Sequence, residues 1–362
     1  MMRQAYAEPD SRSSLFVRHA VLKKRCFHLT TERAVRALRI IDTEDGPRGR
    51  ITEMEQADLT AGEVVIESRY SSLNYKDALA ITGAGKIARK RPLNAGIDVA
   101  GVVQASDDTR FAPGDEVLVT GWQLSETRDG GLADYVRVPA HCVTALPAGL
   151  TAWEAMALGT AGFTAGLAIS RLRDNFQSPE AGPILVTGAS GGVGMFAIQM
   201  LAQAGFSPVA VTRRVEAQGP ALRELGATDV IAPDTLDLGG KPLGSETYGG
   251  AIDALGGPVL ADLLGHIVQF GNVAAIGLAA GPKLETTVLP FILRGVSLLG
   301  INSVECPAPR REAVWGDLAG ELKPAGLDRI AHETIGLNDV QAVCEAIMAG
   351  EHSGRTVVDV TR

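Results

Sequence analysis

The sequence is poor in the residues that would build a metal site, a disulfide framework or a membrane span. Its four cysteines, Cys26, Cys142, Cys306 and Cys344, lie far apart and form neither a CxxC pair nor a Cys/His spacing. Neither a zinc site nor a set of disulfides is therefore expected. No apolar run reaches about 18 residues, the length that a membrane-spanning helix needs. These absences predict a reduced, cytoplasmic protein without a metal or a membrane partner.

Positive charge is also scarce over most of the chain. The net charge is −8 over 362 residues, which argues against nucleic acid as a partner because phosphate backbones bind basic surfaces. Residues 1–34 differ, with seven Lys/Arg against three Asp/Glu, a net of +4 (7 − 3). They could be a targeting peptide, but the unbroken apolar core of a secretory signal is missing. We therefore expect a disordered extension, with the folded protein beginning near Val35.

The distribution of apolar residues predicts two domains. Residues 35–155 hold short alternating segments broken by Gly, Pro and Asp, a pattern typical of a β-rich, barrel-like domain. In residues 156–301, apolar β-type runs alternate with helical segments of roughly ten residues, which predicts an α/β fold with a doubly wound parallel sheet. Residues 302–362 contain two further helical segments and a closing strand, and we expect them to return to the first domain.

The segment "ILVTGASGGVGMFAIQM" predicts a dinucleotide-binding loop between a strand and a helix. Gly188 would permit the tight turn, and Gly191 and Gly192 would leave room for a pyrophosphate at the helix N-terminus. Gly194 would let the helix pack closely on the sheet. The residues predicted to bind the cofactor in this loop are Ser190, Gly191, Gly192, Val193 and Gly194.

The end of the next strand indicates which dinucleotide binds. NAD sites have an acidic residue there, whereas this chain has Thr212, Arg213 and Arg214. A carboxylate would repel a 2′-phosphate, while a guanidinium can hold it through two parallel hydrogen bonds. We therefore predict NADPH as the cofactor. The alternative is that both arginines are solvated loop residues.

Several strings along the chain resemble one family. They include "SSLNYKDALAITG", "GIDVAGVV", "LGTAGFTA", "VTGASGGVG", "GAIDALGG", "VLPFILRGVSLLGINSV" and "GRTVV". Together they run from about Val35 to the C-terminus. On these motifs the chain resembles the acrylyl-CoA reductase (NADPH) family, the zinc-free, quinone-oxidoreductase-like branch of the medium-chain dehydrogenase/reductase superfamily. One departure is Asn302, where the family pattern leads us to expect Asp.

The resemblance implies a GroES-like catalytic domain beside the Rossmann domain, in a homodimer. It implies NADPH-dependent, zinc-independent reduction of a 2,3-unsaturated acyl-CoA, with acryloyl-CoA giving propanoyl-CoA. It also implies that Thr160 and Leu278 line the nicotinamide pocket and that Asn302 lies near the cofactor. Two alternatives stay open: an NADPH-dependent quinone or general enone reductase, and an NADPH-binding sensor without turnover.

The stretch "SSLNYKDALAITG" places chemistry at the end of a predicted strand. Asn74 could donate its amide N–H to the thioester oxygen, and Asp77 could position a water or substrate group and take part in proton delivery. Tyr75 could donate its phenol or line the nicotinamide pocket, while Lys76 is expected to point away into an ion pair. The alternative is that Asn74 or Asp77 only caps the short helix that follows.

A basic stretch, "GKIARKRP", follows the catalytic segment. It could bind the phosphates of coenzyme A, although a run of charges is more often a solvated surface. The cations concerned are Lys86, Arg89, Lys90 and Arg91.

Overall fold

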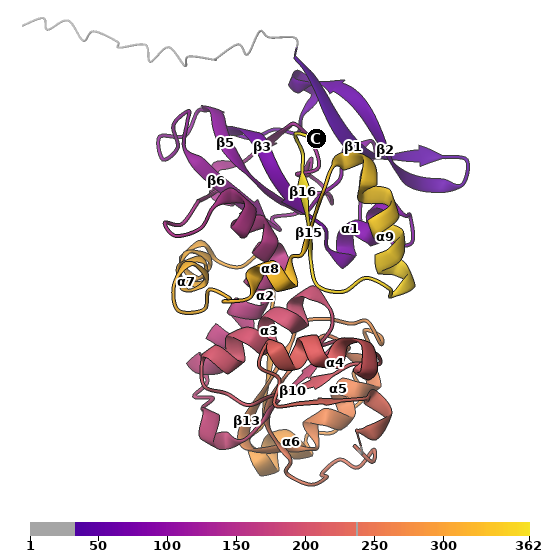
Figure 1. Ribbon diagram of the computed structural model, residues 1–362, viewed down its shortest axis with the longest axis vertical. Helices are drawn as coiled ribbons and strands as arrows, with labels where there is room; N and C mark the ends of the chain where they lie inside the picture. The colour runs from indigo at the N-terminus through magenta and orange to yellow at the C-terminus, as the bar shows by residue number, and fades with distance from the viewer. Residues whose placement is uncertain (1–32, 237) are drawn as a thin grey trace, which may run out of the picture. The chain divides into compact units, whose positions relative to one another are not determined.

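The computed structural model describes residues 33–236 and 238–362 (Figure 1). Most of the predicted N-terminal extension and Cys26 lie outside these residues. Arg33 and Ala34 are described, and Ala34 is already the first residue of strand β1.

Two sheets form the first domain. One has three strands in the order β2-β1-β4 and the other has the order β15-β16-β3-β5-β6-β8, with β7 paired to β3. Alternating apolar residues make these strands, as in β1, whose side chains alternate between buried and partly exposed positions. The strands of the N-terminal part are β1 (Ala34–Thr43), β2 (Gly46–Glu55), β3 (Val64–Ser72), β4 (Leu93–Asn94), β5 (Asp98–Ser106), β6 (Glu116–Thr120), β7 (Tyr135–Val138) and β8 (Thr144–Ala145).

The second domain contains a six-stranded parallel sheet with the order β11-β10-β9-β12-β13-β14. The order reverses between β9 and β12, which is the switch point of a doubly wound fold. The predicted fold class is therefore confirmed. The strands are β9 (Ile184–Thr187), β10 (Pro208–Val211), β11 (Asp229–Ile231), β12 (Tyr248–Asp253), β13 (Ile267–Ala275) and β14 (Ser297–Gly300). The helices are α3 (Gly192–Gln203), α4 (Val215–Glu224), α5 (Gly257–Leu264) and α6 (Leu289–Arg294).

Helix α2 (Ala152–Asp174) joins the two domains. Thr151 begins it with a capping box, accepting from the N–H of Glu154, whose carboxylate binds the N–H of Thr151 in return. The helix is long and apolar enough to cross a membrane, but 83% of its most apolar window is buried inside the protein. Its apolar surface therefore packs in the core, where Phe163 stacks against Trp315.

The C-terminal part returns to the first domain, as Figure 1 shows. Strand β16 (Thr356–Asp359) inserts between β15 (Glu333–Ile335) and β3, with Val358 opposite Ser71. Helix α9 (Val340–Ala349) packs on α1 (Tyr75–Ile81) through a cluster that includes Ile81 and Cys344. The remaining helices are α7 (Ala308–Ala319) and α8 (Leu327–Ile330).

Candidate active site

A buried polar cluster lies where β3 ends and α1 begins, and Asp98 is at its centre. Asp98 is the first residue of β5 and has no exposed surface. Its Oδ2 accepts from the Ser72 hydroxyl at 2.7 Å and from the Asn74 amide at 2.8 Å. The backbone N–H of Thr160 also donates to this oxygen, at 2.9 Å. An acid held this way remains a strong hydrogen-bond acceptor that fixes its donors in place.

Asn74 and Asp77 form the start of α1. The Asp77 carboxylate accepts from the Asn74 backbone N–H at 2.9 Å, which is the capping interaction that the sequence left open as an alternative. The Asn74 amide, however, reaches beyond a cap. It donates to Asp77 at 3.1 Å and to Asp98 at 2.8 Å, and its oxygen accepts from Arg355 at 2.9 Å. All polar atoms of this half-buried side chain are therefore oriented by charged neighbours.

Asp77 lies deeper than the sequence analysis assumed. It is fully buried, and its second oxygen accepts from the N–H of Ile97 at 2.9 Å. Because its side chain has no exposed surface and bonds to Asn74 and Ile97, Asp77 positions Asn74 and does not face a substrate in this conformation. Tyr75, in contrast, is 56% exposed on the first turn of α1.

Arg355 completes the cluster and was missed by the sequence analysis. Its guanidinium is buried and donates to the Ser72 hydroxyl at 2.7 Å and to the backbone oxygen of Leu73 at 2.5 Å. It also lies 3.7 Å from the Asp98 carboxylate. Its signals in the sequence were the string "GRTVV", quoted for the family resemblance, and its place directly before the buried strand "TVVDV".

A break in α2 makes room for this cluster. Gly159 has φ of +50° and ψ of −155° inside the helix, and a Cβ there would lie about 2.6 Å from both Asp98 Oδ2 and Ser72 Oγ. The break turns the N–H and hydroxyl of Thr160 toward Asp98, at 2.9 and 2.5 Å. The structure thus places Thr160, predicted to line the nicotinamide pocket, beside the buried polar cluster.

The pair of buried carboxylates changes the titration of Asp77. Burial and then the neighbouring Asp98 raise the pKa of Asp77 from 3.8 to about 7, against the lowering effect of its bonds to Asn74 and Ile97. A folded-state pKa above the unfolded one means that the native protein holds this proton more tightly. The contribution of Asp77 protonation to the free energy of unfolding is complete below about pH 4 and is lost as the pH rises through 7.

We therefore expect Asp77→Asn to remove part of the pH dependence of stability. Between pH 5 and 8, the free energy of unfolding should fall more in the wild type than in the variant, by on the order of 2 kcal/mol. Urea unfolding at several pH values measures both slopes, and each protein is compared with itself because the substitution also changes hydrogen bonds. Parallel slopes would show that Asp77 titrates normally.

The predicted dinucleotide loop has the expected strand–turn–helix geometry. Gly188 has φ of +63° after β9, and a Cβ on Gly194 would lie 2.5 Å from the Gly188 carbonyl oxygen. The turn and the close packing expected of these two glycines are therefore present. At Gly191 a built Cβ would be in ordinary van der Waals contact, 3.4 Å from the Gly188 carbonyl oxygen.

At Gly192 the structure differs from the prediction. The space beside it, assigned above to a pyrophosphate, is filled by Arg355, whose Cδ lies 2.5 Å from the Cβ position. The return segment 351–355 causes this, because Gly354 pairs with Gly191 and donates its N–H to Ser190 O at 3.3 Å. We call residues 351–355 the strap. It runs from the dinucleotide loop to the buried cluster.

Three predicted cofactor residues meet at the end of β10. Arg214 Nη2 and the Thr212 hydroxyl each lie 3.3 Å from the Ser190 hydroxyl. Arg214 also donates to the backbone oxygens of Glu351 and His352, both at 3.0 Å. Its described partners are thus neutral oxygens, and two of its five N–H groups are left for an anion. Arg213 is exposed, so this corner fits a 2′-phosphate.

The other predicted cofactor residues lie at the carboxyl ends of β13 and β14. Leu278 follows β13 and is 63% exposed. Asn302 follows β14, and its Oδ1 accepts from the N–H groups of Val304 and Glu305 at 3.1 and 3.2 Å. An Asp would accept the same two bonds, which explains how Asn can occupy the position where the family pattern suggests Asp. Val193 lies on the first turn of α3 and is half-buried.

The basic stretch is partly neutralised by its neighbours. Arg91 pairs with Asp42 at 2.6 Å, and Glu126 lies 3.6 Å from Arg89. Glu126 also pairs with Lys76 at 2.8 Å, which confirms the ion pair expected for Lys76. Lys86 and Lys90 are exposed. The structure thus leaves mainly the two lysines available to an external anion.

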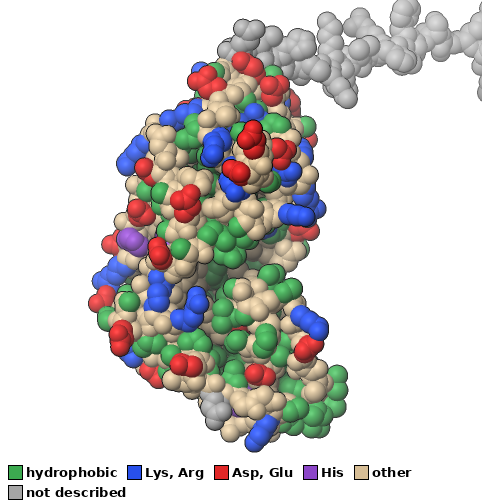
Figure 2. All heavy atoms as spheres, turned by 90° about the vertical axis from the view of Figure 1, so that its right-hand side faces the viewer, with side chains coloured by type: hydrophobic (Ala, Val, Ile, Leu, Met, Phe, Trp, Pro, Cys, Tyr) green, Lys and Arg blue, Asp and Glu red, His purple; other side chains and the backbone are tan. Residues whose placement is uncertain are grey.

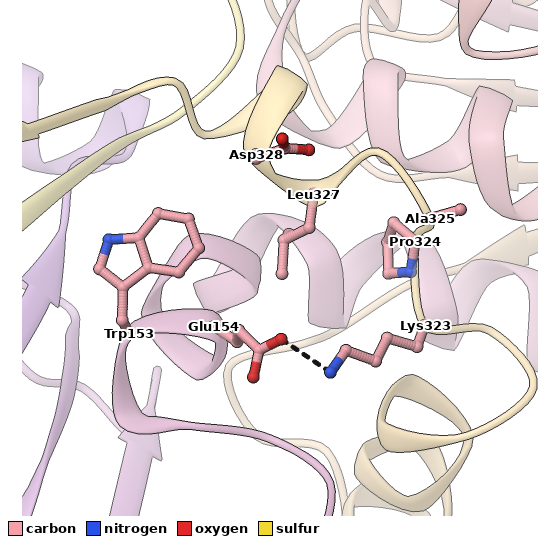
Figure 3. A pocket seen from close by; sticks show the side chains of 7 residues that line it. All are labelled: Trp153, Glu154, Lys323, Pro324, Ala325, Leu327 and Asp328. Atoms are coloured by element: carbon pink, nitrogen blue, oxygen red, sulfur yellow. Dashed lines mark ion pairs between the residues drawn. The ribbon is translucent and has the colours of Figure 1, made fainter.

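A cavity of about 410 Å³ lies away from all of these residues, at the start of α2 and near α8 (Figure 3). Glu154 and Lys323 point toward each other across it and pair at 2.7 Å. Glu154 is already committed to the cap of α2 and to Lys323, and the other carboxylate of the lining, Asp328, is exposed. Within residues 33–236 and 238–362, no three His, Cys, Asp or Glu side chains are arranged to hold a metal.

Proteins similar to most of this chain include named reductases and oxidoreductases. Residues 60–148 match the alcohol dehydrogenase GroES-like domain family, and residues 192–316 match the zinc-binding dehydrogenase family. The chain is 43% identical over 321 residues to the acrylyl-CoA reductase AcuI of Ruegeria pomeroyi, covering 88% of this chain and 97% of that protein. It is 44% identical over 323 residues, 89% of this chain and 98% of the relative, to YhfP of Bacillus subtilis, whose name describes a candidate quinone oxidoreductase.

Solved structures agree with these relatives. YhdH of Escherichia coli K-12 with bound NADPH is 44% identical and superimposes with a TM-score of 0.86, over 90% of this chain and 99% of that one. The B. subtilis YhfP structure, with NAD bound, gives a TM-score of 0.87 at 42% identity, over 91% of this chain and 100% of that one. Related proteins therefore differ in the dinucleotide found in their crystals, and the residues at the end of β10 decide the choice here.

Proposed function

The chain belongs to the acrylyl-CoA reductase and quinone-oxidoreductase-like branch of the medium-chain dehydrogenase/reductase superfamily, and from this we propose that it reduces the 2,3 double bond of an acyl-CoA with NADPH. The observation that carries the substrate class is its 43% identity over 97% of the Ruegeria acrylyl-CoA reductase. Acryloyl-CoA, giving propanoyl-CoA, is the substrate we propose first. A quinone or simple enone is the second candidate, because the match to YhfP is equally strong.

NADPH is supported over NADH by the charge at the end of β10. Arg214 has only neutral partners, Ser190 Oγ and the strap carbonyls, and this position has no acidic side chain that would accept a ribose hydroxyl. A phosphate dianion would compensate this charge. Arg213, exposed beside it, would add a second guanidinium.

We expect Arg214→Ala to raise the KM for NADPH at least tenfold while changing the KM for NADH less than threefold. Arg213→Ala should act in the same direction but more weakly, because its side chain lacks the fixed contacts that orient Arg214. Steady-state kinetics with both cofactors measures this. An equal rise in the KM for NADPH and for NADH in Arg214→Ala would contradict a 2′-phosphate site.

The catalytic residues we propose are Asn74 and Tyr75. Bound NADPH supplies the hydride that the β carbon of the substrate accepts. Negative charge then develops on the thioester oxygen, and the Asn74 amide can stabilise it by exchanging its longer bond, 3.1 Å to Asp77, for one to that oxygen. Asp98 and Arg355 hold the amide in place, and Asp77 still accepts from the Asn74 backbone N–H. Tyr75, at the exposed edge of the cluster, is the proposed donor of the proton to the α carbon.

The coenzyme A phosphates would be bound by the basic stretch. Lys86 and Lys90 are exposed, and Arg89 is 69% exposed despite its contact with Glu126. Arg91 is tied to Asp42 and contributes least. Because these charges are in water, their attraction for phosphate should weaken as salt is added.

The test is NADPH oxidation with acryloyl-CoA, crotonyl-CoA and a simple quinone, at two salt concentrations. The proposed function requires kcat/KM to be highest for an acyl-CoA and to fall with salt. A higher kcat/KM for the quinone would favour the second candidate. If NADPH binds but no acceptor is reduced, the protein is instead a dinucleotide-binding sensor.

We also propose that two copies associate through β14, in a cytoplasmic homodimer. Strand β14 is the edge of the six-stranded sheet, and the residues around it leave large apolar side chains in water. Figure 2 shows hydrophobic side chains gathered at the lower end of the molecule, the end where Figure 1 places α6. The exposed apolar residues are Phe176, Phe270, Val288, Ile292 and Leu293, 61–93% exposed. Light scattering should give a dimer mass that Ile292→Glu lowers and Ile51→Glu, in β2, does not.

A further inference from the structure

Arg311, on α7, is a buried charge that the proposed chemistry does not use. It is 2% exposed, and in the described part of the chain no carboxylate forms an ion pair with its guanidinium. Burial lowers its pKa to about 10, so it stays charged at neutral pH. Such a charge is retained in a protein interior only if its surroundings compensate it.

Carbonyl oxygens and aromatic faces compensate Arg311. Nη1 donates to the backbone oxygen and the hydroxyl of Thr120, both at 2.9 Å. Nη2 donates to the backbone oxygens of Ser303 and Val304, at 2.9 and 3.2 Å. The guanidinium carbon lies 4.9 Å from the centre of the Trp122 ring and 4.7 Å from that of Phe163. A planar cation with a fork of donors is required for this arrangement.

Two of the residues that contact Arg311, Thr120 and Phe163, lie close to the buried cluster around Asp98. Thr120 ends β6 and pairs in register with Asp98. Phe163 lies one helical turn after Thr160, which binds Asp98 through its N–H and its hydroxyl. Arg311 therefore contacts two of the elements that hold the central acid of the active site.

Two others, Ser303 and Val304, lie at the edge of the cofactor domain. In a doubly wound sheet each half binds one mononucleotide at the carboxyl ends of its strands. Because Arg214 marks the phosphate end at β10, the half formed by β12, β13 and β14 would take the nicotinamide. Ser303 and Val304 lie in the turn that follows β14, the turn shaped by Asn302.

The loop that follows Thr120 also bonds directly to the turn that holds Val304. The backbone N–H of Trp122 donates to Val304 O at 3.1 Å, and the Gln123 side-chain amide donates to the Glu305 carboxylate at 2.8 Å. Trp122, Gln123 and Ser125 all have positive φ, between 48° and 64°. Non-glycine residues keep such conformations only where neighbouring groups fix them, so this loop has one imposed shape, and Arg311 packs against it.

We propose that Arg311 is a positioning residue that holds the nicotinamide half of the cofactor site at a fixed distance from the Asp98 cluster. The inference rests on the proposed function, since it assumes that NADPH delivers a hydride at this cluster. A shift in this distance would slow hydride transfer without weakening the grip on the 2′-phosphate.

The test uses Arg311→Lys, which keeps the charge but lacks the planar fork. Calorimetry measures the affinity of this variant for NADP+ and for 2′-phospho-ADP-ribose, a fragment that has no nicotinamide. Its affinity for the fragment should stay within twofold of the wild-type value. Its affinity for NADP+ should fall toward its affinity for the fragment. With 4-deuterated NADPH, kcat should fall at least tenfold and its isotope effect should rise, because hydride transfer becomes slower than the other steps. Arg310→Lys is the matched control, since Arg310 is a neighbouring, half-exposed arginine paired with Asp174, and it should match wild type throughout.

A second variant tests the inference in case Arg311→Lys fails to fold. Gln123→Ala removes the bond to Glu305 and a bond that the Gln123 side chain accepts from the Thr127 hydroxyl, but it leaves Arg311 in place. It should shift the isotope effect in the same direction by a smaller amount. If Arg311→Lys loses melting temperature but keeps the wild-type NADP+ affinity and isotope effect, Arg311 is structural only and the inference is wrong. If the wild type itself reduces no acceptor, the proposed function fails, and the calorimetric comparison still decides the role of Arg311.

Discussion

Replacing Arg355 by methionine is expected to lower the free energy of unfolding by about 3–5 kcal/mol, the usual result of removing one partner from a buried pair. The side chains of Arg355 and Asp98 are 3% and 0% exposed, so Asp98 would lose its nearest compensating charge without gaining water. Four oxygen acceptors, on Ser72, Leu73, Asn74 and Ala157, would also lose a donor. Urea unfolding measures the change.

Two further variants make this result specific. Arg329→Met removes a 63% exposed arginine beside Glu224 and should cost less than about 1 kcal/mol, as surface pairs do. Combining Arg355→Met with Asp98→Asn should cost less than the sum of the single changes, because the second substitution removes the uncompensated charge. A loss below 1 kcal/mol for Arg355→Met would mean that the guanidinium is not needed to hold the cluster.

The second large effect is expected in catalysis, at Asn74. Asn74→Ala should lower kcat with acryloyl-CoA by about 10²–10³-fold, the range seen when one oxyanion donor is removed. The KM for NADPH should stay within threefold, because the Asn74 side chain bonds to Asp77, Asp98 and Arg355 and not to the dinucleotide loop or Arg214. Stopped-flow measurement of NADPH oxidation under single-turnover conditions separates the chemical step from product release.

The matched control for Asn74 uses a different N-cap. Serine caps a helix about as well as asparagine, but it lacks the amide that bonds to Asp77, Asp98 and Arg355 together. Asn74→Ser should therefore keep most of the stability and lose as much kcat as Asn74→Ala. A serine variant with near wild-type kcat would reduce Asn74 to a helix cap.

Local sequence patterns were enough to predict the fold. The strand–turn–helix around Gly188 and Gly194, and the alternation of β-type runs with helices, depend on residues a few positions apart. The ion pair of Lys76 was also anticipated, although its partner Glu126 was not. These features follow from periodicity, turn chemistry and helix geometry, which act over short stretches of chain.

The buried cluster could be predicted only in part, because it is assembled across the whole chain. Arg355 and Asn74 are 281 residues apart in sequence, and no local pattern brings them together. Asp98 did leave a signal, as an acid within the apolar string "GIDVAGVV", and buried acids of this kind are rare unless they are partnered. The space beside Gly192 was assigned to the cofactor because the strap whose Arg355 fills it comes from far along the chain, and no pattern near Gly192 indicates it.

The position of β16 has a consequence for biosynthesis. Val357 pairs with Ser72, 285 positions earlier (357 − 72), so the sheet that carries Ser72 cannot close until residue 357 has left the ribosome. The dinucleotide domain, which is contiguous in sequence, can form sooner. Nascent chains should therefore fold the dinucleotide domain before they can catalyse, and ribosome-stalled chains ending before residue 351 would lack both the strap and turnover.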